Sequence, residues 1–94
     1  MITIVYYDEY ESEYSEKSGS FQEAISDSSI LTVTENLADS IKAVEKHQKE
    51  NEDSDIDYYF QFWNAGEQCS AVRIGGPIQD HLEELNQHLK SFLH

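Results

Sequence analysis

The chain opens with a short hydrophobic segment that has the composition of a β-strand. Residues 2–7 are Ile-Thr-Ile-Val-Tyr-Tyr, and β-branched and aromatic residues of this kind favour strands. Beyond them, tyrosine and acidic residues alternate as far as residue 16. A continuing strand would place one set of side chains on one face, Tyr6, Tyr10 and Tyr14, and a second set on the other, Tyr7, Glu9, Glu11 and Glu13. We favour this strand, although the three tyrosines also fit the spacing of a helix.

Shorter signals follow before the first helix. Lys17-Ser18-Gly19-Ser20 has the composition of a turn. The segment 21–25 is consistent with either a return strand or one helical turn. Ser28-Ser29 then interrupts the pattern, and residues 30–33, Ile-Leu-Thr-Val, predict a short strand of their own.

An amphipathic helix is predicted from Thr34 onward. Thr34 is a good N-cap, and Glu35 lies in the first turn, where the helix dipole favours an acid. The apolar residues recur at helical spacing and predict one buried stripe, made of Leu37, Ala38, Ile41 and Val44. The acidic segment 50–55 ends the helix, because Asn, Asp and Ser favour loops and acids are unfavourable at the negative end of the dipole.

The clearest β-hairpin lies between residues 57 and 74. Residues 57–63 form an aromatic strand, residues 64–67 a tight turn and residues 68–74 the return strand. Alternation gives the two strands a common buried face, formed by Tyr58, Phe60, Phe62, Val72 and Ile74. The opposite face would carry Tyr59 and Trp63, with Tyr7 as a further candidate, and we interpret it as a contact surface.

A second helix is predicted after Gly75-Gly76-Pro77. These residues end the sheet, and Pro77 is suited to the first helical position. The apolar residues that follow recur at helical spacing in a single stripe, formed by Ile78, Leu82, Leu85, Leu89 and Phe92. Together the elements predict one α+β domain over residues 1–94, with an antiparallel sheet of about four or five strands and two main helices packed on one face.

Charge narrows the classes of function. The 94 residues include 6 Lys and Arg against 19 Asp and Glu, a formal net charge of −13. Affinity for nucleic acid comes from cations that displace counterions from phosphates, so direct binding of DNA or RNA is not expected. The single cysteine excludes an intrachain disulfide and favours a reducing compartment. Because there is no basic leader and no apolar run of about 18 residues, we expect a cytoplasmic protein that does not bind membranes.

The acidic residues form two runs, and these are the main candidates for a binding site. We interpret them as surrogates for nucleic-acid phosphates in a protein with a basic partner, and the set comprises Asp8, Glu9, Glu11, Glu13, Glu16, Glu52, Asp53, Asp55 and Asp57. In an extended strand, carboxylates at alternate positions lie about 6.7 Å apart, which is about two nucleotide rises of B-DNA. Aromatic side chains supply rigid contact area in interfaces, and the candidate anchors are Tyr10, Tyr14 and Trp63.

Metal and catalytic sites are weaker candidates. The segment 53–57 begins like an EF-hand loop, but Tyr58 stands where that loop needs glycine and Asn64 where it needs glutamate. His81 and His88 are two helical turns apart, about 10 Å, which is too far to share a zinc ion unaided. The sequence has no phosphate-binding glycine loop and no nucleophile elbow. We therefore expect no metal, no cofactor and no enzymatic activity.

In character the sequence resembles two groups of small acidic inhibitors. Its size, charge and acidic, tyrosine-rich segment 8–16 resemble phage-type DNA-mimic proteins, including anti-restriction and anti-CRISPR inhibitors. The order of a strand, the helix from Thr34 and the two strands 57–63 and 68–74 is similar to bacterial toxin-immunity proteins. Both resemblances imply a stoichiometric inhibitor without a catalytic site.

The leading hypothesis is a DNA mimic that occupies the basic groove of a host defence nuclease or of another DNA-binding protein. An immunity protein for a basic nuclease toxin is the nearest alternative. A small acidic regulatory subunit is the third. Homodimerisation through the aromatic face stays open. It would bury Tyr59 and Trp63 and double the net charge of −13.

Overall fold

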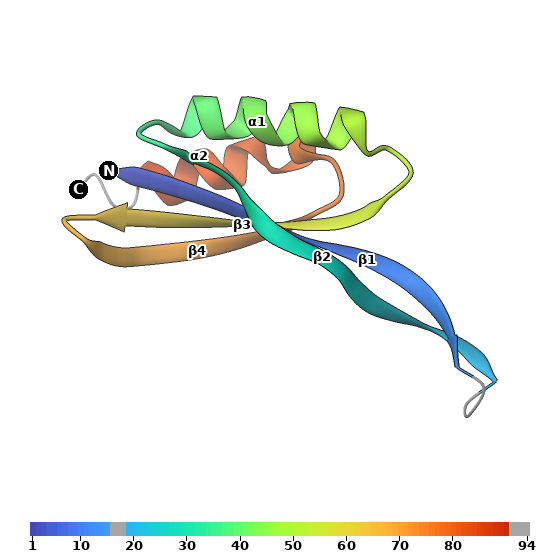
Figure 1. The fold of residues 1–94 in the computed structure, drawn as a ribbon. Coiled ribbons are helices and arrows are strands. Elements are labelled where there is room, and N and C mark those ends of the chain that lie inside the picture. The colour runs from blue at the N-terminus through green and yellow to red at the C-terminus, as the bar shows by residue number, and fades with distance from the viewer. Residues whose placement is uncertain (16–18, 91–94) are drawn as a thin grey trace.

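The chain folds as a four-stranded antiparallel sheet with helices on one side, shown as a computed structural model in Figure 1. The structure describes residues 1–15 and 19–90, with side chains in that part except at residues 12–15 and 21–23. The strands are β1 (Ile2–Ser15), β2 (Ser20–Thr34), β3 (Asp55–Asn64) and β4 (Glu67–Gly75), in the spatial order β2-β1-β3-β4. The helical elements are α1 (Leu37–Glu50), the 3₁₀ turn η1 (Ile78–His81) and α2 (Leu82–Lys90).

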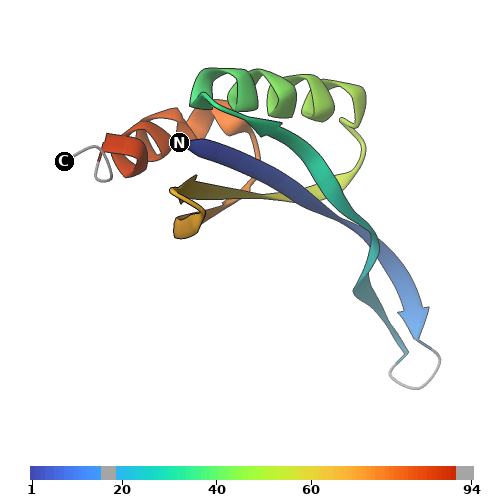
Figure 2. The same ribbon diagram turned by 60° about the vertical axis from the view of Figure 1, so that its left-hand side comes forward.

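The predicted α+β architecture is confirmed, and the sheet has four strands in the described part of the chain. β1 and β3 are the central strands, and α1 and α2 lie on the same side of the sheet in both views (Figures 1 and 2). This arrangement follows from amphipathicity, because each helix has one apolar stripe and the sheet has one apolar face to cover.

The hydrophobic core fills the space between the sheet and the helices. Val5 of β1 and Val44 of α1 are fully buried, as is Leu85 of α2. Burying side chains of this size contributes roughly 1.5–3 kcal/mol each. The face predicted for the hairpin of β3 and β4 is confirmed, since its five members are all buried: Tyr58, Phe60, Phe62, Val72 and Ile74.

β1 and β2 extend beyond the rest of the sheet as a two-stranded arm. β1 pairs with β3 only as far as Tyr10, opposite Asp55, whereas its pairing with β2 continues to Ser15, opposite Ser20. We define the arm as residues 11–15 of β1 and 20–24 of β2, and Figures 1 and 2 show it projecting away from the helices. The molecule is accordingly elongated, with extents of 52 × 26 × 20 Å.

β2 is one continuous strand, which corrects the prediction of an interruption at Ser28-Ser29. The segment 21–25 is extended and not helical, and residues 30–33 continue the same strand. Two register shifts leave Ser26 and Leu31 as extra residues opposite β1. Bulges of this kind bend and twist a strand without ending its pairing, so a serine-rich stretch stays within the sheet.

Helix α1 begins later than predicted. Its N-cap is Asn36 and not Thr34, because the Asn36 side-chain oxygen accepts a hydrogen bond from the Asp39 amide at 3.0 Å. The Thr34 hydroxyl instead shares a 2.6 Å hydrogen bond with the buried Ser40 hydroxyl. Ala38, predicted in the buried stripe, is exposed, whereas Leu37 and Val44 are buried as expected.

The C-terminal helical region also differs at its start. Pro77 caps the 3₁₀ turn η1 from an extended conformation, so it precedes the first helical position instead of occupying it. α2 proper begins at Leu82. Ile78 and Leu85 are buried and Leu82 and Leu89 pack against the core, while Phe92 lies outside the described residues.

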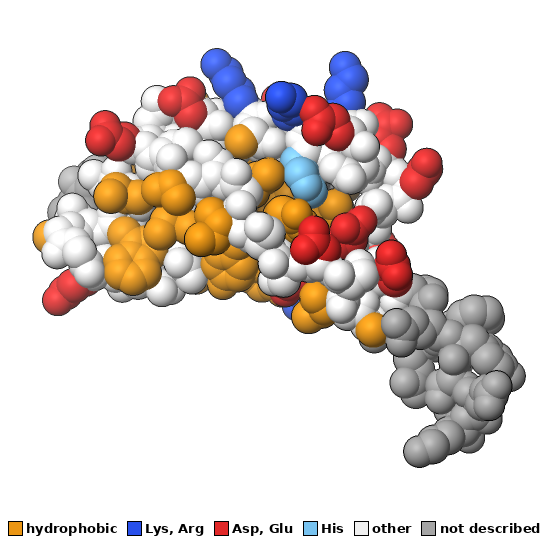
Figure 3. Space-filling model, in the orientation of Figure 1, with side chains coloured by type: hydrophobic (Ala, Val, Ile, Leu, Met, Phe, Trp, Pro, Cys, Tyr) orange, Lys and Arg blue, Asp and Glu red, His pale blue; other side chains and the backbone are white. Residues whose placement is uncertain are grey.

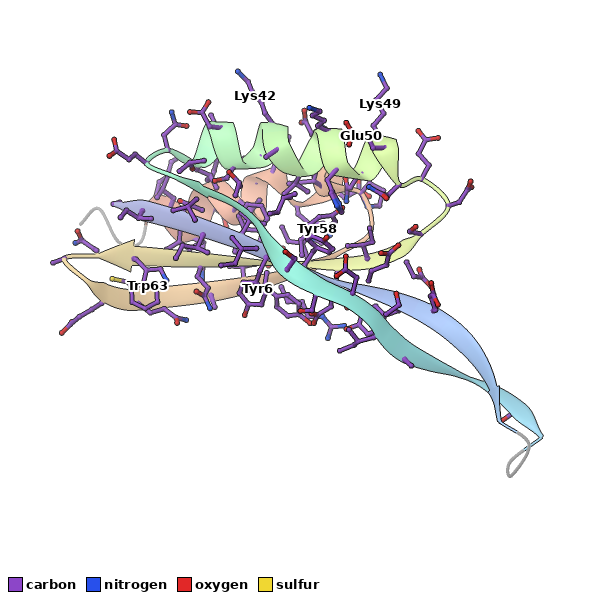
Figure 4. All side chains as sticks on the ribbon, viewed as in Figure 1. Tyr6, Lys42, Lys49, Glu50, Tyr58 and Trp63 are labelled. Carbon is purple, nitrogen blue, oxygen red and sulfur yellow. The ribbon has the colours of Figure 1, made fainter. Side chains whose placement is uncertain are left out.

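The sheet face turned away from the helices is called the open face. Tyr6 and Tyr59 stack on it with ring centroids 5.0 Å apart, and Figure 4 shows Tyr6 and Trp63 on the opposite side of the sheet from Tyr58. The expected position of Tyr59 and Trp63 is thus confirmed. The suggestion that Tyr7 joins them is wrong, because Tyr7 packs against the core and the His47 ring on the helix side.

Candidate functional site

The two acidic runs meet at the end of the sheet from which the arm departs. β3 is antiparallel to β1, so the start of β3 lies beside the middle of β1, with Asp55 opposite Tyr10. The connection between α1 and β3 reaches the same place. Here the chain forms a groove with a volume of about 590 Å³, which we call the acidic groove. It is lined by Glu9, Tyr10, Glu11, Glu52, Asp53, Ser54 and Asp55.

Local structure explains why the second run lies at this position. Helix α1 ends at Glu50, and the Asn51 side chain donates to the His47 carbonyl at 2.8 Å. The Ser54 amide then donates to the Asn51 carbonyl at 3.0 Å and turns the chain toward β3. Glu52 and Asp53 lie in this turn and are exposed. Five acidic residues from the two runs therefore contribute to the lining of one groove.

Asp27 is an additional acid near this groove that sequence reasoning missed. It lies directly opposite Glu9 in the pairing of β1 with β2. The Tyr7 hydroxyl donates to the Asp27 carboxylate at 3.0 Å, and this hydrogen bond raises the pKa of the Tyr7 phenol, with desolvation adding to it. The sequence offered no signal for Asp27, because its position depends on the register shifts in β2.

Two of the predicted phosphate surrogates are occupied by other groups. Asp8 accepts a hydrogen bond of 2.6 Å from the Ser28 hydroxyl. Asp57, whose side chain is 17% exposed, forms an ion pair with Arg73, and this pairing raises the pKa of the Arg73 guanidinium. Their charges are therefore less accessible to a partner than the charges of Glu11, Glu52 and Asp53 lining the acidic groove.

The three aromatic candidates are not brought together. Tyr10 lines the acidic groove, and its hydrogen bond to Tyr59 helps to raise the pKa of Tyr59 to about 12. Trp63 pairs with Ile2 at the other end of β3, eight residues from Asp55, a distance of about 26 Å along a strand. The Tyr14 and Glu13 side chains are outside the description, although both residues belong to β1, and Glu16 lies outside the described residues.

In the described part of the chain, lysines lie along α1, and Arg73 of β4 lies next to the acidic groove, where it lines a hollow with Tyr10 and Asp55. Lys42 and Lys49 point from α1 away from the sheet in Figure 4, and Lys46 pairs with Glu50 on the same helix at 3.9 Å. Figure 3 shows Lys and Arg side chains mainly along the top edge of this view, and Asp and Glu side chains both toward the arm and at the other end of the molecule. Lys49 lines a hollow next to the groove together with Glu52, so positive charge adjoins the acidic groove without lining it.

A cluster of ring side chains anchors α1 beside the groove. His47 Nδ1 and the Tyr58 hydroxyl are 2.8 Å apart, and the His47 ring lies 4.6 Å from the Tyr7 ring. Burial, with the nearby Tyr7 and Glu9, raises the pKa of Tyr58 to about 12. These contacts connect the C-terminal half of α1 to β1 and β3, and thereby hold the connection that carries Glu52 and Asp53.

The residues considered for metal binding make other contacts. His81 lies 3.2 Å from Glu84 and 3.0 Å from the Gly75 carbonyl, and the hydrogen bond to Glu84 raises the His81 pKa. His88 hydrogen-bonds Ser70 and so connects α2 to β4. Among the described residues, no group of three or more His, Cys, Asp or Glu side chains is arranged to hold a metal ion.

Comparisons of the chain with protein-family models, curated proteins and solved structures found no match. Within the part of the chain that the structure describes, none of the helices has both the length and the apolar character needed to cross a membrane.

Proposed function

We propose that the protein is a DNA mimic that inhibits a nuclease or another DNA-binding protein by occupying its basic groove. The observation that carries the proposal is the acidic groove, which is lined by Glu9 and Glu11 of the first acidic run together with Glu52, Asp53 and Asp55 of the second, about forty residues further along the chain. A scattered distribution of these side chains would have argued against it.

The electrostatic argument concerns how a partner would recognise this end of the molecule. Carboxylates held together on a folded scaffold create a negative potential that steers a cation-lined cleft toward them. Lys49 of α1 and Arg73 of β4 adjoin the groove, but neither is among the residues that line it. The arm continues the acidic sequence of β1 beyond the sheet, with Glu11 and Glu13 on a strand that can enter a cleft.

An immunity protein for a basic nuclease toxin is the second candidate, because the same acids would serve it. It would bind one cognate toxin, beside or over the active site, whereas a mimic competes with DNA for the groove itself. Competition with duplex DNA therefore distinguishes a protein that occupies the partner's DNA-binding groove from one that binds beside that groove. Specificity for a single partner separates the immunity function from broader mimicry.

The test combines affinity capture with matched charge variants. Immobilised protein captures basic partners from a bacterial lysate, and each partner is then measured against duplex DNA at two salt concentrations. In the groove variant, three acids are neutralised: Glu9→Gln, Glu11→Gln and Asp55→Asn. In the control variant, three exposed acids elsewhere are neutralised: Glu35→Gln, Glu67→Gln and Asp80→Asn.

Mimicry predicts that DNA and the protein exclude each other and that binding weakens as salt rises. The groove variant should bind at least about tenfold more weakly, because each charge-assisted contact contributes about 1.5–3 kcal/mol, and the control variant should bind as the wild type does. A partner that binds DNA and the protein at once, or that does not distinguish the two variants, would contradict the proposal.

A further inference from the structure

The open face carries an apolar patch at the end of the sheet away from the arm. Three of its residues are large hydrophobics with high exposure: Ile2 at 45%, Ile30 at 64% and Val33 at 57%. Ile4, Tyr6, Gln61 and Trp63 complete it, since they alternate with the buried residues of β1 and β3. Contiguous apolar surface of this kind marks an interaction site.

The seven residues of the patch also include no charged side chain, although the chain as a whole has a net charge of −13. The open-face carboxylates Asp8 and Asp57 lie toward the arm, and they are bonded to Ser28 and Arg73. A basic partner attracted to the acidic groove would find no complementary charge here, so the patch serves a different contact.

A hollow beside Trp63 gives the patch its shape. It has a volume of about 400 Å³ and is almost wholly apolar, lined by Met1, Ile2, Ile4, Trp63, Ala65 and Gly66. The indole nitrogen of Trp63 donates to the Gln61 side chain at 3.2 Å, which leaves the ring face available for contact. The hollow can thus receive a ring or aliphatic side chain from a neighbouring molecule.

We propose that a second copy of this chain covers the patch, with the two open faces packed against each other and the two chains reversed in direction. A two-fold axis across the strands near Ile4 reverses the second sheet, so the two arms and their acids point in opposite directions. A two-fold axis parallel to the strands would instead bring the two arms together, with their acidic residues facing each other. Electrostatics therefore selects the reversed arrangement, in which Tyr59 of each copy lies over Trp63 of the other.

The available area supports a weak dimer. The contact extends beyond the patch onto β4, where Ala71 lies beside Gln61 and Arg73 lies beside Tyr59. Four strands about 4.8 Å apart and an overlap of about six residue rises give a flat contact of about 19 × 20 Å, or about 380 Å² per copy. Side-chain relief enlarges this value, and the total for two copies is on the order of 1,000 Å², at the lower limit for a specific interface. We therefore expect reversible association that depends on protein concentration. This inference does not depend on the proposed function.

Sedimentation analysis of the full chain between about 5 and about 500 μM tests the proposal. The apparent mass should rise from one chain to two, and added salt should favour the dimer by screening residual repulsion. The emission of Trp63, the single tryptophan, should shift to shorter wavelength over the same range as its ring becomes buried.

Matched variants identify the surface. Val33→Glu places a charge in the patch at a 57% exposed position, and should weaken association at least tenfold and abolish the shift in emission. Ala38→Glu adds the same charge at an exposed position on α1 and should associate as the wild type does. Ile30→Thr keeps a β-branched side chain and should also weaken association. It provides the test if Val33→Glu unfolds the protein. A monomer at every concentration, or association unchanged in both patch variants, would overturn the proposal.

Discussion

The buried hydroxyl of Tyr58 should make the fold sensitive to alkaline pH. Tyr58 is 1% exposed between the sheet and α1, and burial with the nearby Tyr7 and Glu9 raises the pKa of its phenol from 10.0 to about 12. In the unfolded chain the phenol ionises near pH 10, so the folded state binds this proton more tightly. The stability contributed by the group is fully present below pH 10 and is lost as the pH rises toward 12.

The size of the effect follows from the shift. A difference of about two pKa units corresponds to about 3 kcal/mol, and about half of it is lost at pH 11. Tyr58→Phe removes the ionisation together with the 2.8 Å hydrogen bond to His47, which costs about 1 kcal/mol. The wild type should therefore be more stable than the variant at neutral pH and less stable near pH 12, with the two curves crossing between about pH 10 and about pH 11.

Urea unfolding followed by far-ultraviolet circular dichroism, at steps from about pH 8 to about pH 12, measures both free energies of unfolding. Deprotonation of the lysines and of Tyr59, whose pKa is also raised to about 12, is common to both proteins. It therefore cancels in the difference between them. Parallel curves that never cross would refute the reasoning, because they would mean that the phenol ionises alike in the folded and unfolded states.

Two further substitutions test local assignments. Asp57→Asn should lower the free energy of unfolding by less than about 1 kcal/mol, because its ion-pair partner Arg73 has a side chain that is 65% exposed. Partner binding in the capture assay should not change. A loss of binding would show that Asp57 contributes to the binding site. Ala65→Asn should raise the free energy of unfolding by about 1 kcal/mol, and with it the melting temperature, because Ala65 has a φ of 52° in the turn before Gly66, a conformation that asparagine tolerates better. Gly66→Ala is the opposing control: Gly66 has a φ of 81°, so this substitution should lower the melting temperature.

Elements with strong hydrophobic periodicity could be predicted from the sequence. The strands β3 and β4 were expected over residues 57–63 and 68–74, and the structure extends each by one or two residues per end. Every second side chain of this hairpin is buried against the helices, so apolar residues recur at every second position of the sequence and predict both strands. β2 offered no such pattern, because its serines are kept extended by pairing with β1 and by bulges at Ser26 and Leu31.

The first residue of helix α1 could not be predicted from local residue preferences alone. Thr34 and Asn36 are both suitable N-caps, and they are two residues apart. Packing decides between them, since starting at Leu37 buries Leu37, Ser40 and Val44 on one side. The Ser40 hydroxyl is then satisfied by Thr34 at 2.6 Å. A buried serine at this position could not be foreseen, because its partner comes from the preceding strand.

The composition of the candidate site was visible in the sequence, but its geometry was not. Acidic runs are recognised by counting, whereas the meeting of the two runs requires the register that sets Asp55 opposite Tyr10. The same register places Asp27 opposite Glu9. It also separates Trp63 from the groove by most of the length of β3, because strands convert sequence separation into distance.

The position of the acidic groove explains how the fold accommodates so much like charge. The groove lies where α1 has ended and β3 is beginning, and Glu52, Asp53 and Asp55 are exposed there. Exposed charges keep most of their hydration, and salt screens those that are more than about 8 Å apart. The core depends on residues such as Val5 and Phe60, which are fully buried. Repulsion at the groove therefore acts mainly on a connection and on one end of the sheet, while the hydrophobic contacts that determine the fold lie under α1 and α2.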